Sequence, residues 1–249
     1  MRRHELSDAQ WARLEPLLPG RSGSPGARAH DNRRFLNAVV WIAKTGAPWR
    51  DLPERFGKPN TVLVRLRRWA RAGRWQAIFE AMQDPDLEWM MLDSTSIRAH
   101  MSASGQKGGN QQHRLGRSRG GLTTKLHVVC DALGNALRFV LSPGQHADIR
   151  YGPRLVEGLR AAAVIADRGY DARAFVDQIG ASGAVAVIPS RRTNREQRVV
   201  DWNLYADRNK IERLIGRLKG FRRVGTRYDK TEESFLAFVY VAATLLWLQ

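Results

Sequence analysis

The first third of the chain repeats a pattern in which apolar residues recur at helical spacing and turn-forming residues interrupt them. This pattern predicts helices over residues 7–18, 31–46, 52–56 and 61–72. The first opens on a capping-box pattern at Ser7, and a stretch rich in Pro, Gly and Ser separates it from the second. A short turn separates the last two, which is helix-turn-helix spacing. Residues 1–82 are therefore predicted to form one small helical, helix-turn-helix-like domain.

From Leu87 onward, short apolar runs bounded by turn formers replace the helical pattern. They predict strands at residues 89–94, 125–131, 137–142, 164–167 and 185–189. A hairpin-type connection at 131–135 joins the second and third strands, so the first three are expected to pair antiparallel. Helical patterns at 148–159 and 171–179 alternate with the last two, which implies crossovers to parallel neighbours. Residues 87–249 are therefore predicted to form an α/β domain with a mixed sheet flanked by helices.

The apolar run from Phe235 to Leu248 predicts a buried closing helix, begun by Thr231 and two acidic residues. The run is shorter than the ~20 residues that span a bilayer, and no apolar leader follows Met1, so no membrane partner is expected. The single cysteine, Cys130, excludes an internal disulfide framework and a multi-cysteine zinc site. It favours a cytosolic setting.

The net charge of the chain indicates what kind of partner it binds. The 249 residues include 41 Lys plus Arg and 24 Asp plus Glu, a formal net charge of +17, and 43% of them are hydrophobic. The apolar content is ample for a folded core, so the chain is not a disordered basic tail. A polyanion is the expected partner, and nucleic acid is the favoured one. Charge alone leaves ribosomal or chromatin-like binding and an acidic membrane surface open.

Two basic segments are candidate DNA contacts. Helix 61–72 combines an apolar stripe with a basic face made of Arg65, Arg67, Arg68 and Arg71. We interpret it as a recognition helix with Arg65 and Arg68 as DNA contacts; the alternative is an amphipathic helix that touches only phosphates or nothing. The glycine-rich loop 105–121 contains Lys107, His113, Arg114, Arg117 and Arg119 and no acid. It is expected to grip phosphates, unless it is a disordered surface loop.

Two aspartates stand where apolar runs end. Asp93 follows Trp89–Leu92 and Asp167 follows Ala163–Ala166, and polar or turn-forming residues come next. If these strands are parallel, both carboxylates lie at the same sheet edge. Buried carboxylates are costly unless they are paired or bind a metal, and Mg²⁺ prefers such oxygen ligands. The sequence therefore predicts a metal site, although each aspartate taken singly could instead cap the following turn.

A third carboxylate, Glu212, lies in a helix-like stretch that is rich in cations. At 100° per residue, Arg208, Glu212 and Lys219 fall within about 40° of one another, beside a separate apolar stripe. This face indicates a metal-and-phosphate site. The alternative is an ordinary i,i+4 ion pair on a solvated helix surface.

The same stretch carries the spacing Tyr-x2-Arg-x3-Glu-x6-Lys, met by Tyr205, Arg208, Glu212 and Lys219. With the blocks at 92–95, 122–127 and 166–171, the chain resembles, over nearly its whole length, the DDE transposases of the bacterial insertion sequence five family. The resemblance implies a ribonuclease H-like core in which Asp93, Asp167 and Glu212 are catalytic and bind metal. It also implies two Mg²⁺ ions, with Mn²⁺ as the alternative.

The activity that the resemblance implies is cleavage of insertion-element ends and joining of the 3′-hydroxyls to target DNA by two-metal phosphoryl transfer. Arg208 and Lys219 are expected at phosphates, and Tyr205 at the DNA backbone or a base. The implied partner is double-stranded DNA, as element terminal inverted repeats and as target. A homodimer or larger assembly on DNA, in the bacterial cytoplasm with the nucleoid, is also implied.

Other classes stay open. A metal-dependent nuclease with the same triad would cut but never join strands, and a catalytically silent DNA-binding regulator would bind element ends without cutting. A recombinase would use Ser94, Ser96 or Tyr170 as nucleophile, but no supporting arginine constellation accompanies these hydroxyls. Three histidines near the motifs are expected to be structural: His100, His127 and His146.

Overall fold

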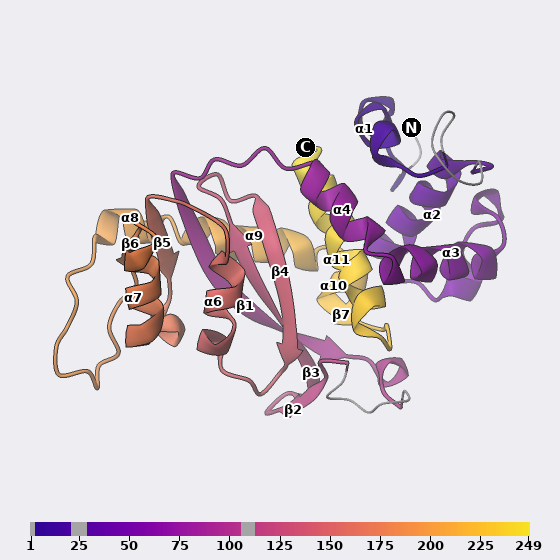
Figure 1. The fold of residues 1–249 in the computed structure, drawn as a ribbon. Helices are drawn as coiled ribbons and strands as arrows, with labels where there is room; N and C mark the ends of the chain where they lie inside the picture. The colour runs from indigo at the N-terminus through magenta and orange to yellow at the C-terminus, as the bar shows by residue number, and fades with distance from the viewer. Residues whose placement is uncertain (1–2, 21–28, 106–112) are drawn as a thin grey trace. The chain divides into compact units, whose positions relative to one another are not determined.

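The computed structural model describes residues 3–20, 29–105 and 113–249 (Figure 1). The described residues form two compact units. A helical unit lies within Met1–Gln83, His100–Gln106 and Leu218–Gln249, and a sheet unit lies within Asp84–Ala99 and Lys107–Arg217. Each unit is assembled from segments that are distant in sequence, whereas the predicted domains are continuous. The division into functional domains at 1–82 and 87–249 stays a prediction.

The helical unit contains α1 (Asp8–Leu14), α2 (Asn32–Thr45), α3 (Pro59–Arg71), α4 (Arg74–Ala81), α10 (Arg222–Gly225) and α11 (Glu232–Trp247). The predicted capping box of α1 is confirmed, because Ser7 and Gln10 exchange hydrogen bonds between side chain and backbone. Asp31 caps α2 by accepting from the Arg34 N–H, and Gly46 ends it in the left-handed conformation at φ 67°.

The helix predicted at residues 52–56 is wrong. Two 3-10 turns stand in this region, Trp49–Asp51 and Glu54–Phe56. Pro48 precedes the first turn and Pro53 the second. Proline disfavours the helical conformation in the residue before it and has no N–H to donate, so the apolar spacing cannot become a continuous helix.

The core of the helical unit is built around α11, the predicted closing helix. Thr231 caps it by accepting from the Ser234 N–H, and nearly every residue from Phe235 to Leu246 is buried. The helix packs against α2, α3 and α4, so apolar side chains around its whole circumference find partners. Across residues 3–20, 29–105 and 113–249, no helix is both long and apolar enough to cross a membrane.

The sheet unit contains β1 (Trp89–Ala99), β2 (Gly116–Ser118), β3 (Gly121–Cys130), β4 (Ala136–Pro143), β5 (Ala163–Ala166) and β6 (Val185–Val187). Strand β3 pairs antiparallel with β1, β2 and β4, while β1 pairs parallel with β5 and β5 with β6. The antiparallel set and the parallel crossovers are confirmed. Because β1 stands between β3 and β5, the sheet changes from antiparallel to parallel pairing at this strand.

Helices α6 (Gly152–Val156), α7 (Arg173–Ala181), α8 (Trp202–Ala206) and α9 (Asn209–Lys219) accompany the sheet. Helix α6 packs against β3 and β4, and α7 packs against β6. In Figure 1 these two helices lie in front of the strands and α9 passes behind them. The predicted class, an α/β mixed sheet flanked by helices, is confirmed.

Two strands differ from the expectations. Strand β1 was expected to end just after Asp93, but it continues to Ala99 because β3 stays paired with it through Arg98 and Thr123 after β5 has ended. Asp93 therefore lies inside a strand, at the point where only the parallel neighbour stops. Strand β2 was not predicted; it lies within the glycine-rich basic loop, of which residues 106–112 fall outside the described residues.

His127 is a buried histidine in the middle of β3. Its Nε2 shares a hydrogen bond of 2.8 Å with the Ser142 hydroxyl, and its Nδ1 lies 3.8 Å from Asp148 Oδ1. The ring stacks on Tyr151 with 4.4 Å between centroids. Burial lowers the pKa of His127 from 6.5 to about 4, outweighing the nearby Asp148 carboxylate, which raises it. The histidine is therefore neutral in the folded protein, as a structural residue would be.

We expect His127 to make stability depend on acidity. Between pH 6.5 and about 4 the unfolded chain binds a proton at this histidine and the folded chain does not. The free energy of unfolding should therefore fall by about 3 kcal/mol as pH drops through this window, since each pKa unit corresponds to ~1.4 kcal/mol.

Urea unfolding at a series of pH values, compared between the native chain and His127→Gln, measures this effect. Glutamine can still form a hydrogen bond with Ser142 but does not titrate, so the variant should lose less stability on acidification. Parallel stability curves for the two proteins would contradict the expectation, because carboxylates that titrate in both would then explain the whole slope.

Candidate active site

The register of β1 and β5 brings two aspartates together. The last pair of this parallel ladder joins Leu92 to Ala166, so Asp93 and Asp167 are the next residues on two neighbouring strands. Corresponding residues of paired strands lie ~5 Å apart and point to the same face. The parallel pairing therefore sets the two residues side by side, although β1 continues past Asp93 while β5 ends at Ala166. Asp167 also accepts from the Gly169 N–H at 2.8 Å, as the cap of a 3-10 turn.

Arg208 joins the third carboxylate to this pair. Its Nη2 lies 3.0 Å from Asp93 Oδ2, and its Nη1 lies 2.5 Å from Glu212 Oε1. The predicted i,i+4 pair between Arg208 and Glu212 on α9 is therefore present, but its arginine also reaches across to β1. One guanidinium thus bridges two carboxylates that come from different elements. Its Nε is buried and has no hydrogen-bond partner among the described residues.

The pKa of Asp93 depends on the same neighbouring charges. Burial, the largest effect, raises the pKa of the Asp93 carboxyl above its ordinary value. The Arg208 guanidinium and the Ser94 N–H, which donates to Asp93 Oδ1 at 2.7 Å, lower the pKa. The charges of Asp167 and Glu212 raise it. Three carboxylates therefore interact at one place, and a cation is needed to offset them.

A fourth carboxylate was missed by sequence reasoning. Asp148 Oδ1 accepts from the Ser94 hydroxyl at 2.7 Å and from Lys125 Nζ at 2.8 Å. A side chain at Gly169 would lie within 2.8 Å of Asp167 Oδ1 and 3.6 Å of Asp148 Oδ2, so both carboxylates border this glycine. Ser94 therefore links Asp148 to Asp93. The sequence carried no signal for it, because Asp148 follows no apolar run and begins a 3-10 turn.

Tyr205 and Lys219 are the other two residues of the cation-rich stretch with a predicted role. Burial raises the pKa of the Tyr205 hydroxyl, and the charges of Asp167 and Asp93 also raise it, which places Tyr205 in the field of the cluster. Lys219 is the last residue of α9. Its contact with a phosphate stays a prediction.

The carboxylates suit a divalent ion in chemistry, since hard cations such as Mg²⁺ take carboxylate oxygens. Within residues 3–20, 29–105 and 113–249, however, no three His, Cys, Asp or Glu side chains are arranged as a ready metal site. The reason is visible in the ion pairs. Arg208 takes the position of a counter-ion between Asp93 and Glu212, so this carboxylate set fits a metal only after the arginine withdraws.

The predicted DNA-contacting arginines stand on α3 and in the basic loop. Arg65 is half-buried, contacts the Asn32 side chain and lies 4.2 Å from the centroid of the Phe35 ring. It is thus engaged within the helical unit, whereas Arg68 is exposed on the same helix. In the basic loop, Arg117 and Arg119 are exposed and Arg114 is half-buried; Lys107 lies outside the described residues. Their contacts with DNA stay predictions.

Comparison with known proteins gives the family. A family model described as "Putative transposase of IS4/5 family" matches residues 6–79, and one described as "Transposase DDE domain" matches residues 85–247, more than half of the chain. A "Putative transposase for insertion sequence element IS6501" of Brucella ovis is 38% identical over 133 residues, which are 51% of this chain and 100% of that protein. The "Insertion element IS402 uncharacterized 16.2 kDa protein" of Burkholderia cepacia is 36% identical over 41% of this chain and 77% of that protein.

Solved structures are more distant. The piggyBac transposase synaptic complex with hairpin DNA is 13% identical, covers 75% of this chain and 48% of that chain, and has a TM-score of 0.40. The Mos1 transposase paired-end complex with left transposon end is 14% identical, covers 83% of each chain, and has a TM-score of 0.28. At these TM-scores neither likeness supports an argument, so the assignment rests on the family models and the sequence relatives. The chain therefore belongs to the IS4/5 family of DDE transposases, which are enzymes that act on DNA and depend on a divalent metal ion.

Proposed function

We propose that Asp93, Asp167 and Glu212 are the catalytic triad with which this transposase cuts the ends of its element and joins the 3′-hydroxyls to target DNA. The observation that carries the proposal is the parallel register that puts Asp93 beside Asp167, together with the Arg208 bridge that ties Glu212 to Asp93. Carboxylates from two strands and one helix converge here, and the family's activity requires such a set.

The three carboxylates would hold two Mg²⁺ ions, or Mn²⁺ in their place. When bound, such ions activate a water or a 3′-hydroxyl and offset charge on the leaving oxygen of an in-line displacement at phosphorus. The chain's own residues prepare this chemistry. Ser94 fixes Asp93 through its N–H, and Lys125 holds Asp148, which in turn accepts from the Ser94 hydroxyl. Asp93 is thus oriented before DNA arrives.

Arg208 has two roles in this proposal. Without metal it offsets the charge of Asp93, whose side chain is 15% exposed, and of Glu212, whose side chain is 56% exposed. Once a metal takes over that role, the guanidinium is free to bind the scissile phosphate or its neighbour, a ligand that it matches with two parallel N–H donors. Lys219 would add a second cation, and Tyr205 would position the DNA backbone or stack on a base.

The proposed substrates are double-stranded DNA of the terminal inverted repeats and of the target. The proposed working form is a homodimer or larger assembly on DNA, since two element ends must be joined in one event. A metal-dependent nuclease and a silent DNA-binding regulator are the competing functions. They share the fold and differ in the products that they form.

Loss of one triad carboxylate should abolish both chemical steps. We expect Asp93→Asn and Glu212→Gln each to lower cleavage and joining at least a hundredfold, because the neutral side chains no longer complete the metal site. The assay incubates the protein with a labelled oligonucleotide that carries its own element end and with a target plasmid, in Mg²⁺ or in EDTA.

Asp177→Asn is the matched control, because Asp177 is a largely exposed carboxylate on α7. It should leave both steps unchanged. Joined products that require metal and both triad residues support the transposase. Metal-dependent cuts without joining would identify a nuclease, binding without cutting would identify a regulator, and full activity of Asp93→Asn would refute the triad.

Removal of Arg208 should strengthen metal binding. If the guanidinium competes with the ion for Asp93 and Glu212, Arg208→Gln should lower the Mg²⁺ concentration at half-saturation by up to about fivefold, since a lost ion pair of up to ~1 kcal/mol corresponds to that factor. The measurement is the rise in melting temperature as Mg²⁺ is added, because a ligand that binds the folded state stabilises it.

Arg213→Gln removes the same charge from an exposed position one residue beyond Glu212 on the same helix. It controls for the general loss of positive charge and should shift Mg²⁺ affinity much less. Equal shifts in the two variants would show that Arg208 does not compete at the site.

A further inference from the structure

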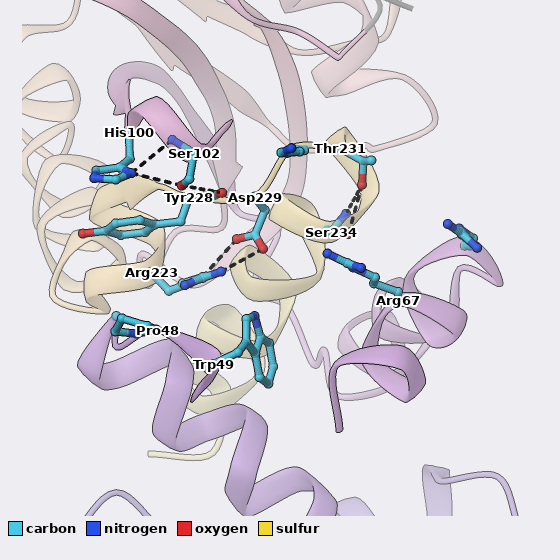
Figure 2. A pocket seen from close by; sticks show the side chains of 13 residues that line it. Pro48, Trp49, Arg67, His100, Ser102, Arg223, Tyr228, Asp229, Thr231 and Ser234 are labelled. Atoms are coloured by element: carbon cyan, nitrogen blue, oxygen red, sulfur yellow. Dashed lines mark hydrogen bonds and ion pairs between the residues drawn. The ribbon is translucent and has the colours of Figure 1, made fainter. Parts of the chain in front are cut away.

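The helical unit contains a pocket that plays no part in the proposed chemistry. It has a volume of about 740 Å³ and is open to solvent, which is the size range of ligand sites. Figure 2 shows its walls, which come from the turn before the 3-10 helix Trp49–Asp51, from α3, from residues 100–102 and from the segment that leads into α11. Every lining residue belongs to the helical unit.

The cations of this pocket are available to a ligand. Arg67 and Arg71 lie one helical turn apart on α3, and Lys230 stands just before α11; all three are exposed. In the described part of the chain, none of the three forms an ion pair with a carboxylate. They contrast with Arg65, whose guanidinium lies over the rings of Phe35 and Trp69.

The one acid that lines the pocket is already neutralised. Asp229 accepts two hydrogen bonds from Arg223, at 3.1 Å each, and both side chains are only 7% exposed. This bidentate pair is a fixed part of the wall, drawn with dashed lines in Figure 2. The pocket therefore presents a surplus of positive charge that no lining residue cancels.

Flat rings complete the wall. Tyr228 packs against the His100 ring with 4.9 Å between centroids, and the Arg223 guanidinium lies 5.1 Å from the Tyr228 ring. Trp49 lines the same space. Ser102 holds the Tyr228 backbone by donating to its carbonyl at 3.3 Å, which fixes this segment. Cations beside aromatic faces are the combination that binds a nucleic-acid strand, through its phosphates and its bases or sugars.

We propose that this pocket binds a strand of DNA, with backbone phosphates on Arg67, Arg71 and Lys230 and a sugar or base against Tyr228 and Trp49. The proposal rests on the proposed function only in taking DNA as the polyanion; it does not use the triad. It also reassigns the basic face of α3. Arg67 and Arg71 are the residues that meet DNA in a shaped site, and Arg65 supports the helix from within.

The first test compares two double variants of equal charge. Arg67→Gln with Arg71→Gln should weaken DNA binding at least tenfold, measured by fluorescence anisotropy with a labelled oligonucleotide. It should also reduce the slope of log affinity against log salt by about 1.4 to 1.8, because each of the two lost phosphate contacts contributes roughly 0.7 to 0.9. Arg13→Gln with Arg74→Gln removes two exposed arginines of the same unit that do not line the pocket, and should change affinity less than twofold.

The second test locates the DNA. Cys130 is the chain's single cysteine and is fully buried, so a cysteine introduced at an exposed position is the reactive thiol. Ser102→Cys lines the pocket and should form a disulfide with an oligonucleotide that carries a thiol tether on its backbone. Ala12→Cys, exposed on α1, should not.

The outcomes separate this proposal from the triad. Equal loss of affinity in the two double variants, or equal cross-linking of the two cysteine variants, overturns the pocket. If a free mononucleotide displaces the labelled oligonucleotide at an equal concentration, the pocket binds single nucleotides and the proposal that it binds a strand is wrong. The pocket is also tested in the Asp93→Asn variant. If this variant still cross-links at Ser102→Cys, the pocket proposal is supported, even if the variant also keeps its joining activity and so refutes the triad.

Discussion

Repulsion among carboxylates is the constraint around which the sheet unit is arranged. Burial makes the negative charge of Asp93 costly, and the charges of Asp167 and Glu212 add to that cost. The protein tolerates this cluster because Arg208 lies between two of its members and backbone N–H groups face the two aspartates. In the proposed function, a metal ion would take over the place between Asp93 and Glu212 that Arg208 holds in this structure.

The change from antiparallel to parallel pairing at β1 makes this site possible. Strand β3 supports β1 along nearly its full length, whereas β5 stops one residue before Asp93. Asp93 is thus held on one side by a continuous ladder and is open on the other, where Asp167 and α9 approach. The antiparallel strand β3 holds Asp93 in a fixed position, and the early end of the parallel strand β5 leaves its side chain accessible.

Sequence reasoning recovered the parts of the site that follow from local pattern. Apolar runs before Asp93 and Asp167 revealed the strands, and the cation-rich helix revealed Glu212. Asp148 was not predicted as a site residue, because its contacts with Ser94 and Lys125 form only in the folded sheet. The extension of β1 was not predicted for a similar reason: its serines are typical of turns, and pairing with β3 overrides that preference. The pocket on the helical unit combines segments more than a hundred residues apart, which no local pattern can join.

The packing of α11 has a consequence for how the chain is made. Its partners α2, α3 and α4 emerge from the ribosome first, yet their shared core lacks its central helix until residues 232–247 have been synthesised. All strands β1 to β6 are translated in between. Domains generally fold in the order of synthesis. Here the sheet unit can fold while the apolar faces of α2, α3 and α4 are still exposed. We therefore expect the sheet unit to fold before the helical unit is complete, so that a nascent chain halted before α11 would leave those apolar faces exposed.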